Sequence, residues 1–531
     1  MEELKVLITT SGIGSRLGDL TQYTNKSLVR IGKKPAIYYI VNNYIKNNIK
    51  KFVITLGHFG EHVREYLTIQ FPKIDFEFVD VDLYEGEGSS LLYSMYQANQ
   101  LLQQPFIFHA CDTYVEEVKT SFDCNWLAYN SDISSASQYR TVRIISDLVA
   151  KINDKGEQNH DGAFIGVVGI KDYEVFWKTA EKFLKQKNSD LSDYTVIKDM
   201  ISNNYNFFGF ETNKWLDIGN IDSLTEAREK ISDSFFILDK VDESIFIDEE
   251  NERVIKFFAN KEVCDNRVKR YNHLNGMIPK IMDKTDHFYS YEFAKGKEYS
   301  HCIDLINIEN FFNWCNTNLW SNTDSHFIDE RKDNIQLKKF YRDKTIERIE
   351  KYKELKGIKT DTFMSVNGLN IPNIENIFEH MDENNLWPIK DTKFTNFHGD
   401  LVLDNIIYNV ENNQFKLIDW RQDFVGDIQY GDPNYDIAKL KHSLTLPNFI
   451  LEQQLFDESE NNLFVWKSNT FIDIENRLDK IIVENGYDLD KINLIKSIIW
   501  LNMSPLHPDP MSDFLFRFGK YNLWRNLNGF S

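Results

Sequence analysis

Over its first 230 residues the sequence alternates short apolar runs with amphipathic stretches. The apolar runs are brief and rich in Val, Ile and Phe, as in buried strands, and the stretches between them have the spacing of helices. Alternation of this kind is typical of βαβ units, which build a mostly parallel sheet with helices on its faces. We therefore predict an α/β, Rossmann-like fold for this part of the chain. The expected strands are Val6–Thr9, Phe52–Leu56, Phe76–Val81 and Phe106–His109, and the expected helices between them include Ala36–Asn47 and Ser89–Leu102.

The alternation ends near residue 235, and the pattern after it is different. A chain of 531 residues is too long for one core and suits two or three domains. The runs Ile245–Ile247 and Val254–Phe258 predict a hairpin just after the change. The rest of the chain is mainly helical, with one hairpin formed by Asn405–Tyr408 and Phe415–Ile418. We predict a first domain at 1–235, then an α+β, bilobal part with a small lobe at 236–297 and a helical lobe at 298–531.

The charge and the cysteines argue against several classes of protein. A net charge of −20 disfavours a general binder of nucleic acid or of anionic membranes, because both need basic surfaces. No stretch approaches the roughly 18 apolar residues needed to cross a bilayer, so we expect no membrane insertion. The five cysteines are scattered without a C-x-x-C pair, and the N-terminal residues are acidic where a signal peptide is basic. We expect a soluble cytoplasmic enzyme that acts on small molecules, and a homo-oligomer is compatible with these features.

The first expected strand runs into a glycine-bearing turn, S-G-I-G-S-R-L at residues 11–17. Gly12 and Gly14 would let backbone N–H groups approach a phosphate closely, because glycine has no side chain to clash. Arg16 adds a permanent cation, and Lys26, in the N-K-S-L that follows, adds a second. A single G-x-G is also compatible with an ordinary tight turn, so the spacing of the other motifs decides between the two interpretations.

Three later motifs complete a pattern that resembles the sugar-nucleotidyltransferase superfamily. G-E-G-S-S, which contains Gly88, precedes an expected helix, and Asp112 follows the fourth expected strand. That position puts Asp112 at the carboxyl edge of the sheet, where open α/β folds bind ligands. W-L-D-I-G, which contains Asp217, comes shortly before the predicted domain boundary. With the turn around Gly14 and N-K-S-L, these motifs occur in the order of that superfamily and cover nearly all of residues 1–230.

The resemblance implies a role for each of these residues. In that superfamily a phosphate oxygen of the acceptor attacks the α-phosphorus of a nucleoside triphosphate, here CTP or UTP. Asp112 and Asp217 would hold Mg²⁺, which screens the repulsion between the two anions. Arg16 and Lys26 would act as catalytic cations on the triphosphate, and Gly88 would lie in the turn that recognises the base. The two glycines of the first turn would bind the phosphates.

The second part of the chain carries a compact motif. F-H-G-D-L contains Asp400, Asn405 follows it by five residues, and Asp419 ends the next expected strand in L-I-D-W-R. This arrangement resembles the catalytic core of the aminoglycoside phosphotransferase and choline kinase family. The resemblance implies that Asp400 accepts or orients the proton of the substrate hydroxyl, while Asn405 and Asp419 hold Mg²⁺ on the phosphates of ATP. It also implies that His398 braces the loop, and that Asp436 starts the next helix as a cap that fixes the loop.

The small lobe of such a kinase should precede this core. Lys256 sits in the apolar run V-I-K-F-F, where a charge is costly unless it meets an anion such as the phosphates of ATP. An edge-strand lysine that points to water remains the alternative. Glu292, in Y-E-F-A-K-G, lies in a segment that resembles the hinge that takes the adenine ring. Either Glu262 or Asp265, on the expected helix Lys261–Leu274, would be the acid partner of Lys256.

Chemistry fixes the order of the two reactions. A kinase makes a phosphorylated small molecule, and a nucleotidyltransferase needs such a molecule as its nucleophile. We therefore predict phosphorylation by ATP, then transfer of a nucleotidyl group from a second triphosphate with release of pyrophosphate, to make a precursor of surface polysaccharide. W-L-D-I-G at residues 215–219 favours a sugar as the acceptor. Choline or ethanolamine, activated with CTP, is the alternative acceptor. A third hypothesis is that one half of the chain is catalytically silent, senses nucleotide and regulates the other half.

An aromatic and polar cluster near the C-terminus has two interpretations. In related kinases the last helices wall the acceptor pocket, but an ordinary aromatic core explains the same residues. The cluster consists of Trp500, His507, Asp509, Phe514, Phe516 and Phe518.

Overall fold

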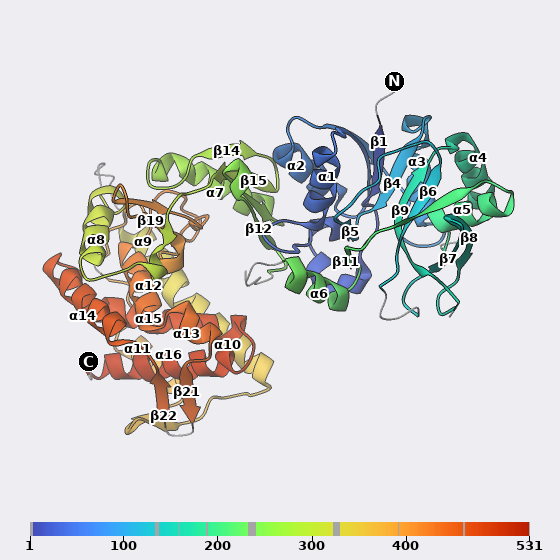
Figure 1. The fold of residues 1–531 in the computed structure, drawn as a ribbon. Coiled ribbons are helices and arrows are strands. Elements are labelled where there is room, and N and C mark those ends of the chain that lie inside the picture. The colour runs from blue at the N-terminus through green and yellow to red at the C-terminus, as the bar shows by residue number, and fades with distance from the viewer. Residues whose placement is uncertain are drawn as a thin grey trace. The chain divides into compact units, whose positions relative to one another are not determined.

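The computed structural model describes residues 4–132, 137–157, 159–186, 190–231, 240–321, 330–390, 392–459 and 462–529 (Figure 1). The chain divides into two compact units. The first consists of Met1–Cys264 and Ile281–Phe293, and the second of Asp265–Lys280 and Ala294–Ser531. The predicted boundary at 235 lies outside the described residues, and the predicted domain limits stay predictions.

A mixed sheet forms the centre of the first unit. Among the described residues it has nine strands, in the order β3-β2-β1-β4-β9-β6-β10-β8-β7. Strands β3, β2, β1 and β4 are parallel, and Val6 lies opposite Phe52 on one side and Ile107 on the other. These are the four predicted strands, so the α/β fold is confirmed. The bounds are β1 Lys5–Thr9, β2 Lys51–Leu56, β3 Asp75–Asp80, β4 Phe106–Ala110, β6 Asn125–Asn130, β7 Thr141–Ile145, β8 Leu148–Asn153, β9 Gly162–Ile170 and β10 Phe207–Glu211.

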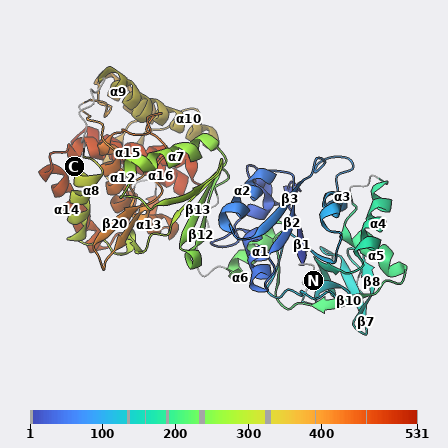
Figure 2. The same cartoon turned by 90° about the horizontal axis from the view of Figure 1, so that it is seen from above.

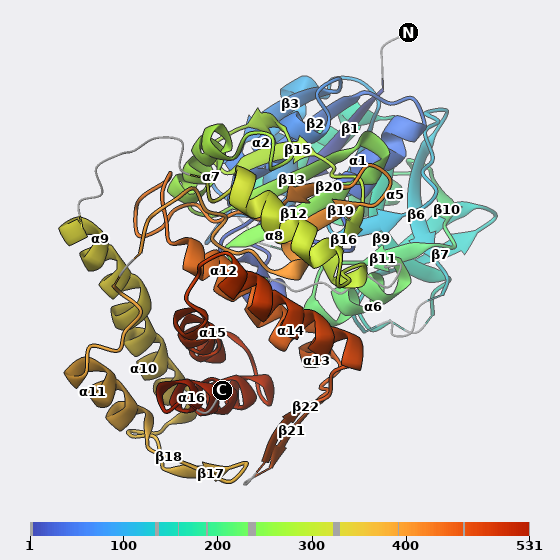
Figure 3. The same cartoon turned by 90° about the vertical axis from the view of Figure 1, so that its left-hand side faces the viewer.

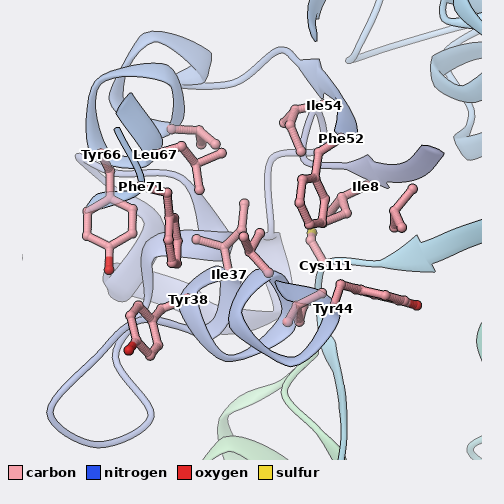
Figure 4. Packing of buried hydrophobic residues seen from close by; sticks show 14 of the residues in the cluster. Ile8, Ile37, Tyr38, Tyr44, Phe52, Ile54, Tyr66, Leu67, Phe71 and Cys111 are labelled. Carbon is pink, nitrogen blue, oxygen red and sulfur yellow. The ribbon is translucent and has the colours of Figure 1, made fainter. Parts of the chain in front are cut away.

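Different helices cover the two faces of this sheet. Because successive side chains of a strand point to opposite faces, Val6 and Ile8 pack in one buried cluster and Leu7 in another. Figure 2 shows α1 and α2 on one side of β1 and α3 on the other, and Figure 4 shows Tyr44 of α1 in the packing around Phe52. The first cluster includes side chains of α1 (Ala36–Lys46) and α2 (Gly60–Gln70), and the second those of α3 (Leu91–Gln97), α4 (Tyr173–Leu184) and α5 (Asp193–Ser202).

A smaller antiparallel sheet also belongs to the first unit. Its order is β12-β13-β15-β14, with β12 and β13 forming the predicted hairpin. Ile255 and Phe257 of β13 lie in the same buried cluster as Tyr66 of α2, whereas Lys256 between them points to the other face of this sheet. The sheet expected as the small lobe of a kinase thus packs on the first unit. The bounds are β12 Glu243–Asp248, β13 Arg253–Phe258, β14 Ile281–Lys284 and β15 Phe288–Glu292, and α7 spans Lys261–Leu274 as predicted.

The second unit is mainly helical. Helix α15 packs against both α12 and α16 (Figure 3). The predicted hairpin is confirmed as β19 and β20, with Tyr408 opposite Phe415. No helix among the described residues is both long and apolar enough to cross a membrane. The main elements are α8 Asn307–Asn318, α9 Glu330–Leu337, α10 Lys344–Lys356, α11 Ile374–Glu383, β19 Ile406–Asn409, β20 Gln414–Leu417, α12 Pro433–Thr445, α13 Asn448–Glu452, α14 Asn469–Glu484, α15 Leu489–Met503 and α16 Met511–Leu527.

Candidate active sites

The glycine-bearing turn after β1 packs directly against the segment that carries Lys26. Gly14 has a φ of 76°, in the left-handed region that favours glycine. A Cβ atom on Gly14 would lie 2.8 Å from the Cβ atom of Lys26, closer than two carbon atoms can approach. Nothing lies within 4 Å of the Cβ position of Gly12. Glycine at position 14 therefore lets the turn and Lys26 come together.

A buried asparagine that the sequence analysis did not single out holds this turn in place. The side chain of Asn25 is buried, and its Nδ2 group donates to the carbonyl oxygens of Thr10, at 2.8 Å, and His58, at 2.6 Å. Its Oδ1 atom accepts from the backbone N–H of Ser27 at 2.9 Å. Asn25 therefore joins the loops that follow β1 and β2 to the segment of Lys26.

Lys26 and Asp112 form an ion pair, with 3.0 Å between Nζ and Oδ2. Burial alone would lower the pKa of Lys26, but the Asp112 carboxylate outweighs burial and raises that pKa. Burial alone would raise the pKa of Asp112, and the charges of Lys26 and Arg16 outweigh it and lower that pKa. Both side chains are therefore charged at neutral pH.

A short pair of strands brings Asp217 beside Asp112, although about a hundred residues separate them. Strand β5 (Thr113–Val115) pairs with β11 (Trp215–Asp217), which places Asp217 opposite Thr113. The backbone N–H of Ile218 donates to the carbonyl oxygen of Asp112 at 2.9 Å. The Asp217 carboxylate accepts from the N–H of Gly219 at 2.9 Å.

Arg16 completes this group of charges. A Cβ atom on Gly219 would lie 3.0 Å from Nη2 of Arg16 and 3.1 Å from Oδ1 of Asp217, so both side chains border Gly219. The structure thus brings Arg16, Lys26, Asp112 and Asp217 together. Two carboxylates beside two cations suit a hard divalent cation such as Mg²⁺, which proteins bind through one or two carboxylates together with phosphate oxygens of the substrate.

Gly88 lies in the turn before α3, with a φ of 87°. The helix begins after Ser90, whose hydroxyl accepts from the backbone N–H of Tyr93 at 3.0 Å. The role of Gly88 in recognition of a base stays a prediction.

The loop that carries Asp400 is fixed by Asp436. The two carboxylate oxygens of Asp436 accept from the backbone N–H groups of His398 and Gly399, both at 2.7 Å. The expectation that Asp436 fixes this loop is therefore confirmed, but its expected place as the cap of the helix is wrong, because α12 begins at Pro433 and Asp432 is its N-cap. Asp436 lies in the first turn, and burial raises its pKa to about 6.

His398 links the Asp400 loop to the loop of Asp419. Its Nε2 atom lies 2.9 Å from the carbonyl oxygen of Ile418, and its Nδ1 atom accepts from the backbone N–H of Asp400 at 3.2 Å. These contacts require the proton on Nε2. Burial lowers the pKa of His398 to about 3, so the ring is neutral at physiological pH.

Asp400 is held between a lysine and an asparagine. Its Oδ1 atom lies 2.9 Å from Nζ of Lys439, and the Nδ2 group of Asn405 donates to its carbonyl oxygen at 2.8 Å. Burial alone would raise the pKa of Asp400, but Lys439, His398 and Arg421 outweigh it and hold that pKa well below its usual range. Asp400 is therefore a carboxylate at neutral pH.

Asp419 and Asn405 lie next to this carboxylate. The backbone N–H of Ile418 donates to the carbonyl oxygen of Asn405 at 2.9 Å, and Asp419 has a φ of 59°. Asp400 and Asp419 both line a cavity of about 290 Å³ in the second unit. The structure thus brings together all three residues predicted from the second motif.

Arg270 is a structural residue of this site that sequence reasoning missed. It is fully buried on α7, and its guanidinium lies 3.9 Å from the ring centroid of Phe397. It donates to the carbonyl oxygens of Phe397, His398, Arg421 and Ile428. Burial lowers the pKa of Arg270 to about 9.

The aromatic cluster near the C-terminus is mainly core. Trp500, Phe514, Phe516 and Phe518 all belong to the buried cluster of the second unit. Asp509 instead forms an ion pair with Lys356 on the surface. Neighbours of the aromatic residues on the same segment reach the cavity beside Asp400, namely Ile499, Asn502, Met503 and Leu506.

Lys256 and Glu292 lie in the first unit. Lys256 is 5% exposed on β13, and Glu292 ends β15 opposite Arg253. Their roles in ATP binding, and the choice of an acid partner for Lys256, stay predictions.

Comparison with known proteins agrees with the two sites. Residues 5–111 match the family described as nucleotidyl transferase, and residues 356–460 match the family described as phosphotransferase enzyme. Glucose-1-phosphate cytidylyltransferase of Salmonella typhimurium is 35% identical over 13% of this chain and 26% of that protein. Choline-phosphate cytidylyltransferase of Streptococcus pneumoniae is 29% identical over 21% of this chain and 46% of that protein. The chain thus spans less than half the length of either of these two curated relatives.

A solved CTP:phosphocholine cytidylyltransferase from Streptococcus pneumoniae is similar to the first part of the chain. The match covers 43% of this chain and 100% of the solved chain, with 20% sequence identity and a TM-score of 0.37. The two family matches concern two separate stretches of the chain, and both families are transferases. More particularly, residues 5–111 are similar to nucleotidyl transferases and residues 356–460 to phosphotransferases, so the chain combines a nucleotidyltransferase-like stretch with a kinase-like one.

Proposed function

We propose that this chain is a bifunctional enzyme that phosphorylates a small hydroxylated metabolite with ATP and then transfers a nucleotidyl group onto the product. The observation that carries this proposal is that one chain brings together two separate sets of charged and polar side chains. Arg16, Lys26, Asp112 and Asp217 form the first set, and Asp400, Asn405 and Asp419 form the second. The final product would be an activated precursor of cell-surface polysaccharide.

In the kinase step Asp400 would orient the hydroxyl group of the acceptor and take its proton. Its depressed pKa keeps it as a carboxylate, and the ion pair with Lys439 and the bond from Asn405 hold the loop around it in place. Asn405 and Asp419 would hold Mg²⁺, which neutralises charge on the phosphates of ATP. Lys256 and Glu292 would bind the phosphates and the adenine of ATP.

In the nucleotidyl step the phosphate of the intermediate would attack the α-phosphorus of CTP or UTP, and pyrophosphate would leave. Both reactants are anions, so the reaction needs positive charge at the point of attack. Arg16 and Lys26 supply two permanent charges, and Asp112 and Asp217 would hold Mg²⁺ beside them. Gly12 and Gly14 would lie against the phosphates of the nucleotide, and Gly88 would lie against its base.

A sugar is the favoured acceptor, and an amino alcohol is the alternative. Relatives of the first domain include a glucose-1-phosphate cytidylyltransferase and a choline-phosphate cytidylyltransferase, so both acceptors occur among similar proteins. The identities are low and the matched stretches are short, so they do not choose between the two. A panel of acceptors with ATP, then CTP or UTP, with products identified by mass spectrometry, decides between them.

Two substitutions separate the two half-reactions. We expect Asp400→Asn to abolish phosphorylation and to leave nucleotidyl transfer to glucose 1-phosphate or phosphocholine intact, because the two sites use different residues. Asp217→Asn should have the opposite effect. The exposed Asp473 on α14 provides the control Asp473→Asn, which should spare both reactions. If either site variant retains both activities, the corresponding site is assigned wrongly. If the unmodified chain lacks one of the two reactions, the corresponding half is a silent nucleotide-sensing module.

A further inference from the structure

The cavity beside Asp400 is strongly basic in a chain that is strongly acidic. The chain has a net charge of −20, yet 5 of the 14 residues that line this cavity are Lys or Arg and only 2 are acidic. The acidic ones are Asp400 and Asp419, which already have roles in the kinase step. The basic residues are Arg267, Lys344, Arg348, Arg421 and Lys439.

Two of the basic residues lie one turn apart on α10. Side chains four residues apart share one face of a helix, so Lys344 and Arg348 line the cavity together. The ring of Phe340, in the π-helical segment Lys338–Asp343 that leads into α10, packs against two cations. Its centroid lies 4.6 Å from Nζ of Lys344 and 5.1 Å from the guanidinium carbon of Arg421. Phe340 therefore holds Lys344 and Arg421 close to each other.

The protein neutralises only part of this positive charge. Lys439 is paired with Asp400 at 2.9 Å, and Arg267 lies 3.9 Å from Oδ1 of Asp419, but within the part of the chain that the structure describes no ion pair is found at Lys344, Arg348 or Arg421. Burial and the neighbouring charges of Arg421, Arg348 and Lys439 lower the pKa of Lys344 to about 7. Like charges brought together in a cavity repel one another, and an anion that binds between them removes the repulsion.

The same cavity is poorly suited to a quaternary ammonium ion. Proteins recognise such cations with several aromatic faces or with carboxylates. Among the described lining residues Tyr435 is the only aromatic one, and Lys344, Arg348 and Arg421 would repel a positive ligand. Ile499, Met503 and Leu506 supply apolar surface, which suits the carbon skeleton of a small molecule.

We propose that the acceptor of the kinase reaction carries an anionic group, a carboxylate or a phosphate, in addition to the hydroxyl group that is phosphorylated, and that Lys344 and Arg348 bind this group. The proposal rests on the proposed kinase function and narrows its acceptor. In the reaction the acceptor hydroxyl oxygen forms a bond to the γ-phosphorus of ATP, and the bond from that phosphorus to the oxygen of ADP breaks. The hydroxyl proton passes to Asp400, and the anionic group stays unchanged. This reading excludes choline and ethanolamine as acceptors.

A panel of acceptors of different charge, with the neutral and anionic ones built on the same carbon skeletons, tests this proposal. The neutral compounds are glycerol and glucose, the carboxylates are glycerate and glucuronate, the phosphates are glycerol 3-phosphate and glucose 6-phosphate, and the cation is choline. Release of ADP and the mass of the product report phosphorylation, and calorimetry on the full chain reports binding. We expect kcat/KM for a carboxylate or a phosphate to exceed that of its neutral counterpart at least about tenfold, because only the anion can form charge-assisted hydrogen bonds with Lys344 and Arg348.

Each outcome of the panel decides the question. A preference for the carboxylates or for the phosphates supports the proposal and identifies the anion. Faster phosphorylation of choline or of a neutral compound overturns it and leaves the kinase function standing. If the anionic compounds bind but nothing in the panel is phosphorylated, the cavity is an anion site and the proposed kinase function fails. If no anionic compound binds or reacts, the proposal is wrong.

Substitutions on α10 test the two residues directly. Lys344→Met and Arg348→Gln should each raise KM for the anionic acceptor about tenfold, with kcat and KM for ATP nearly unchanged. Arg348→Lys should recover part of the loss because it retains the charge. Lys351, exposed on the same helix, provides the matched control Lys351→Met, which should behave as the unmodified enzyme. A rise in KM for ATP instead of KM for the acceptor would assign these cations to the nucleotide and overturn the proposal.

Discussion

The backbone carbonyl groups of the loops around Asp400 converge on one buried guanidinium. Arg270 is 0% exposed and donates to four of these carbonyl oxygens. The planar fork of arginine can satisfy several acceptors at once, and a lysine ammonium cannot reach all four. Arg270 thus fixes the positions of the Asp400 loop and of the segment after Asp419 without taking part in the chemistry.

Arg270→Met should therefore destabilise the second unit and slow the proposed phosphorylation. Removal of the guanidinium leaves buried carbonyl groups without donors, which costs about 1–3 kcal/mol for each group that water cannot reach. We expect the unfolding transition of the second unit to lose about 3 kcal/mol or more, and kcat for phosphorylation to fall at least about tenfold. Urea unfolding and steady-state kinetics measure the two effects.

The neighbouring Lys269 supplies the control. Its side chain is 56% exposed and pairs with Asp265 on the same helix, so Lys269→Met should change stability by less than about 0.5 kcal/mol. Arg270→Lys should be intermediate. If Arg270→Met unfolds like the unmodified protein, the carbonyl groups have other donors and this account of the loop is wrong.

Sequence reasoning found the charged residues of both sites but not the residues that support them. Asp400, Asn405 and Asp419 are close in sequence, and their spacing carries the information. Asn25 belongs to the N-K-S-L motif, but the carbonyl groups that it binds lie in loops after other strands. Nothing in the sequence around Arg270 distinguishes it from a surface residue. An arginine on a polar helix such as α7 is usually exposed, and only the fold reveals that this one is buried.

At the scale of elements, helix α2 and strand β15 meet through two histidines. The rings of His62 on α2 and His287 before β15 lie 4.2 Å apart between centroids, and His62 also packs against Phe257 at 5.0 Å. Glu65, one turn further along α2, accepts from the backbone N–H of His287 at 2.9 Å. Burial, and then the charges of His287 and Lys261, lower the pKa of His62 to about 3.

This contact should make the first unit sensitive to acid. The pKa of His62 is lower in the folded state than its ordinary value of 6.5, so the unfolded chain binds the proton more readily. Stability is then complete above about pH 6.5 and falls as the pH decreases towards 3, with a loss of roughly 2 kcal/mol from this residue at about pH 5. His62→Phe should remove this part of the pH dependence. Thermal unfolding at about pH 7 and pH 5 compares the two proteins.

The exposed His301 provides the matched substitution, His301→Gln, for which we expect the pH dependence of the unmodified chain. An acid sensitivity that is identical in the chain with His62→Phe would show that other groups cause it.

The elements themselves were predicted with unequal success. Strands such as β1 and β2 were found because each is an apolar run long enough to recognise. Strands β5 and β11 have only three residues each, and about a hundred residues separate them in the sequence. No local pattern therefore predicts either strand. Their pairing is nevertheless what places Asp217 beside Asp112. The contact was implied by family resemblance and not by periodicity.

At the scale of the whole chain, the two compact units do not coincide with a simple cut in the sequence. A cut at 235 would assign β12, β13 and β15 to the kinase-like part. In the structure the apolar face of that small sheet lies in the same buried cluster as α2, through Phe246, Phe257 and Phe288 against Tyr66. The sequence revealed that the hairpin exists and that its face is apolar. It did not reveal which element covers that face, because an apolar face has no sequence signal for its partner.

A kinase fragment that begins after the predicted boundary should therefore be unstable. A fragment of residues 240–531 would expose Phe246, Phe257 and Phe288, which are at most 3% exposed in the full chain. Burial of each such side chain contributes about 1.5–3 kcal/mol, so the fragment loses much of the stability of its small sheet. We expect it to aggregate, or to unfold at a temperature well below that of the full chain in a thermal scan. Co-expression with residues 1–231 should recover part of its solubility by covering the same face.

The triple variant Phe246→Ser, Phe257→Ser, Phe288→Ser, made in the full chain, should also lower the unfolding temperature. A fragment 240–531 that is soluble alone and melts with the full chain would mean that α2 is dispensable for the small sheet, and that the kinase-like part is an independent folding unit.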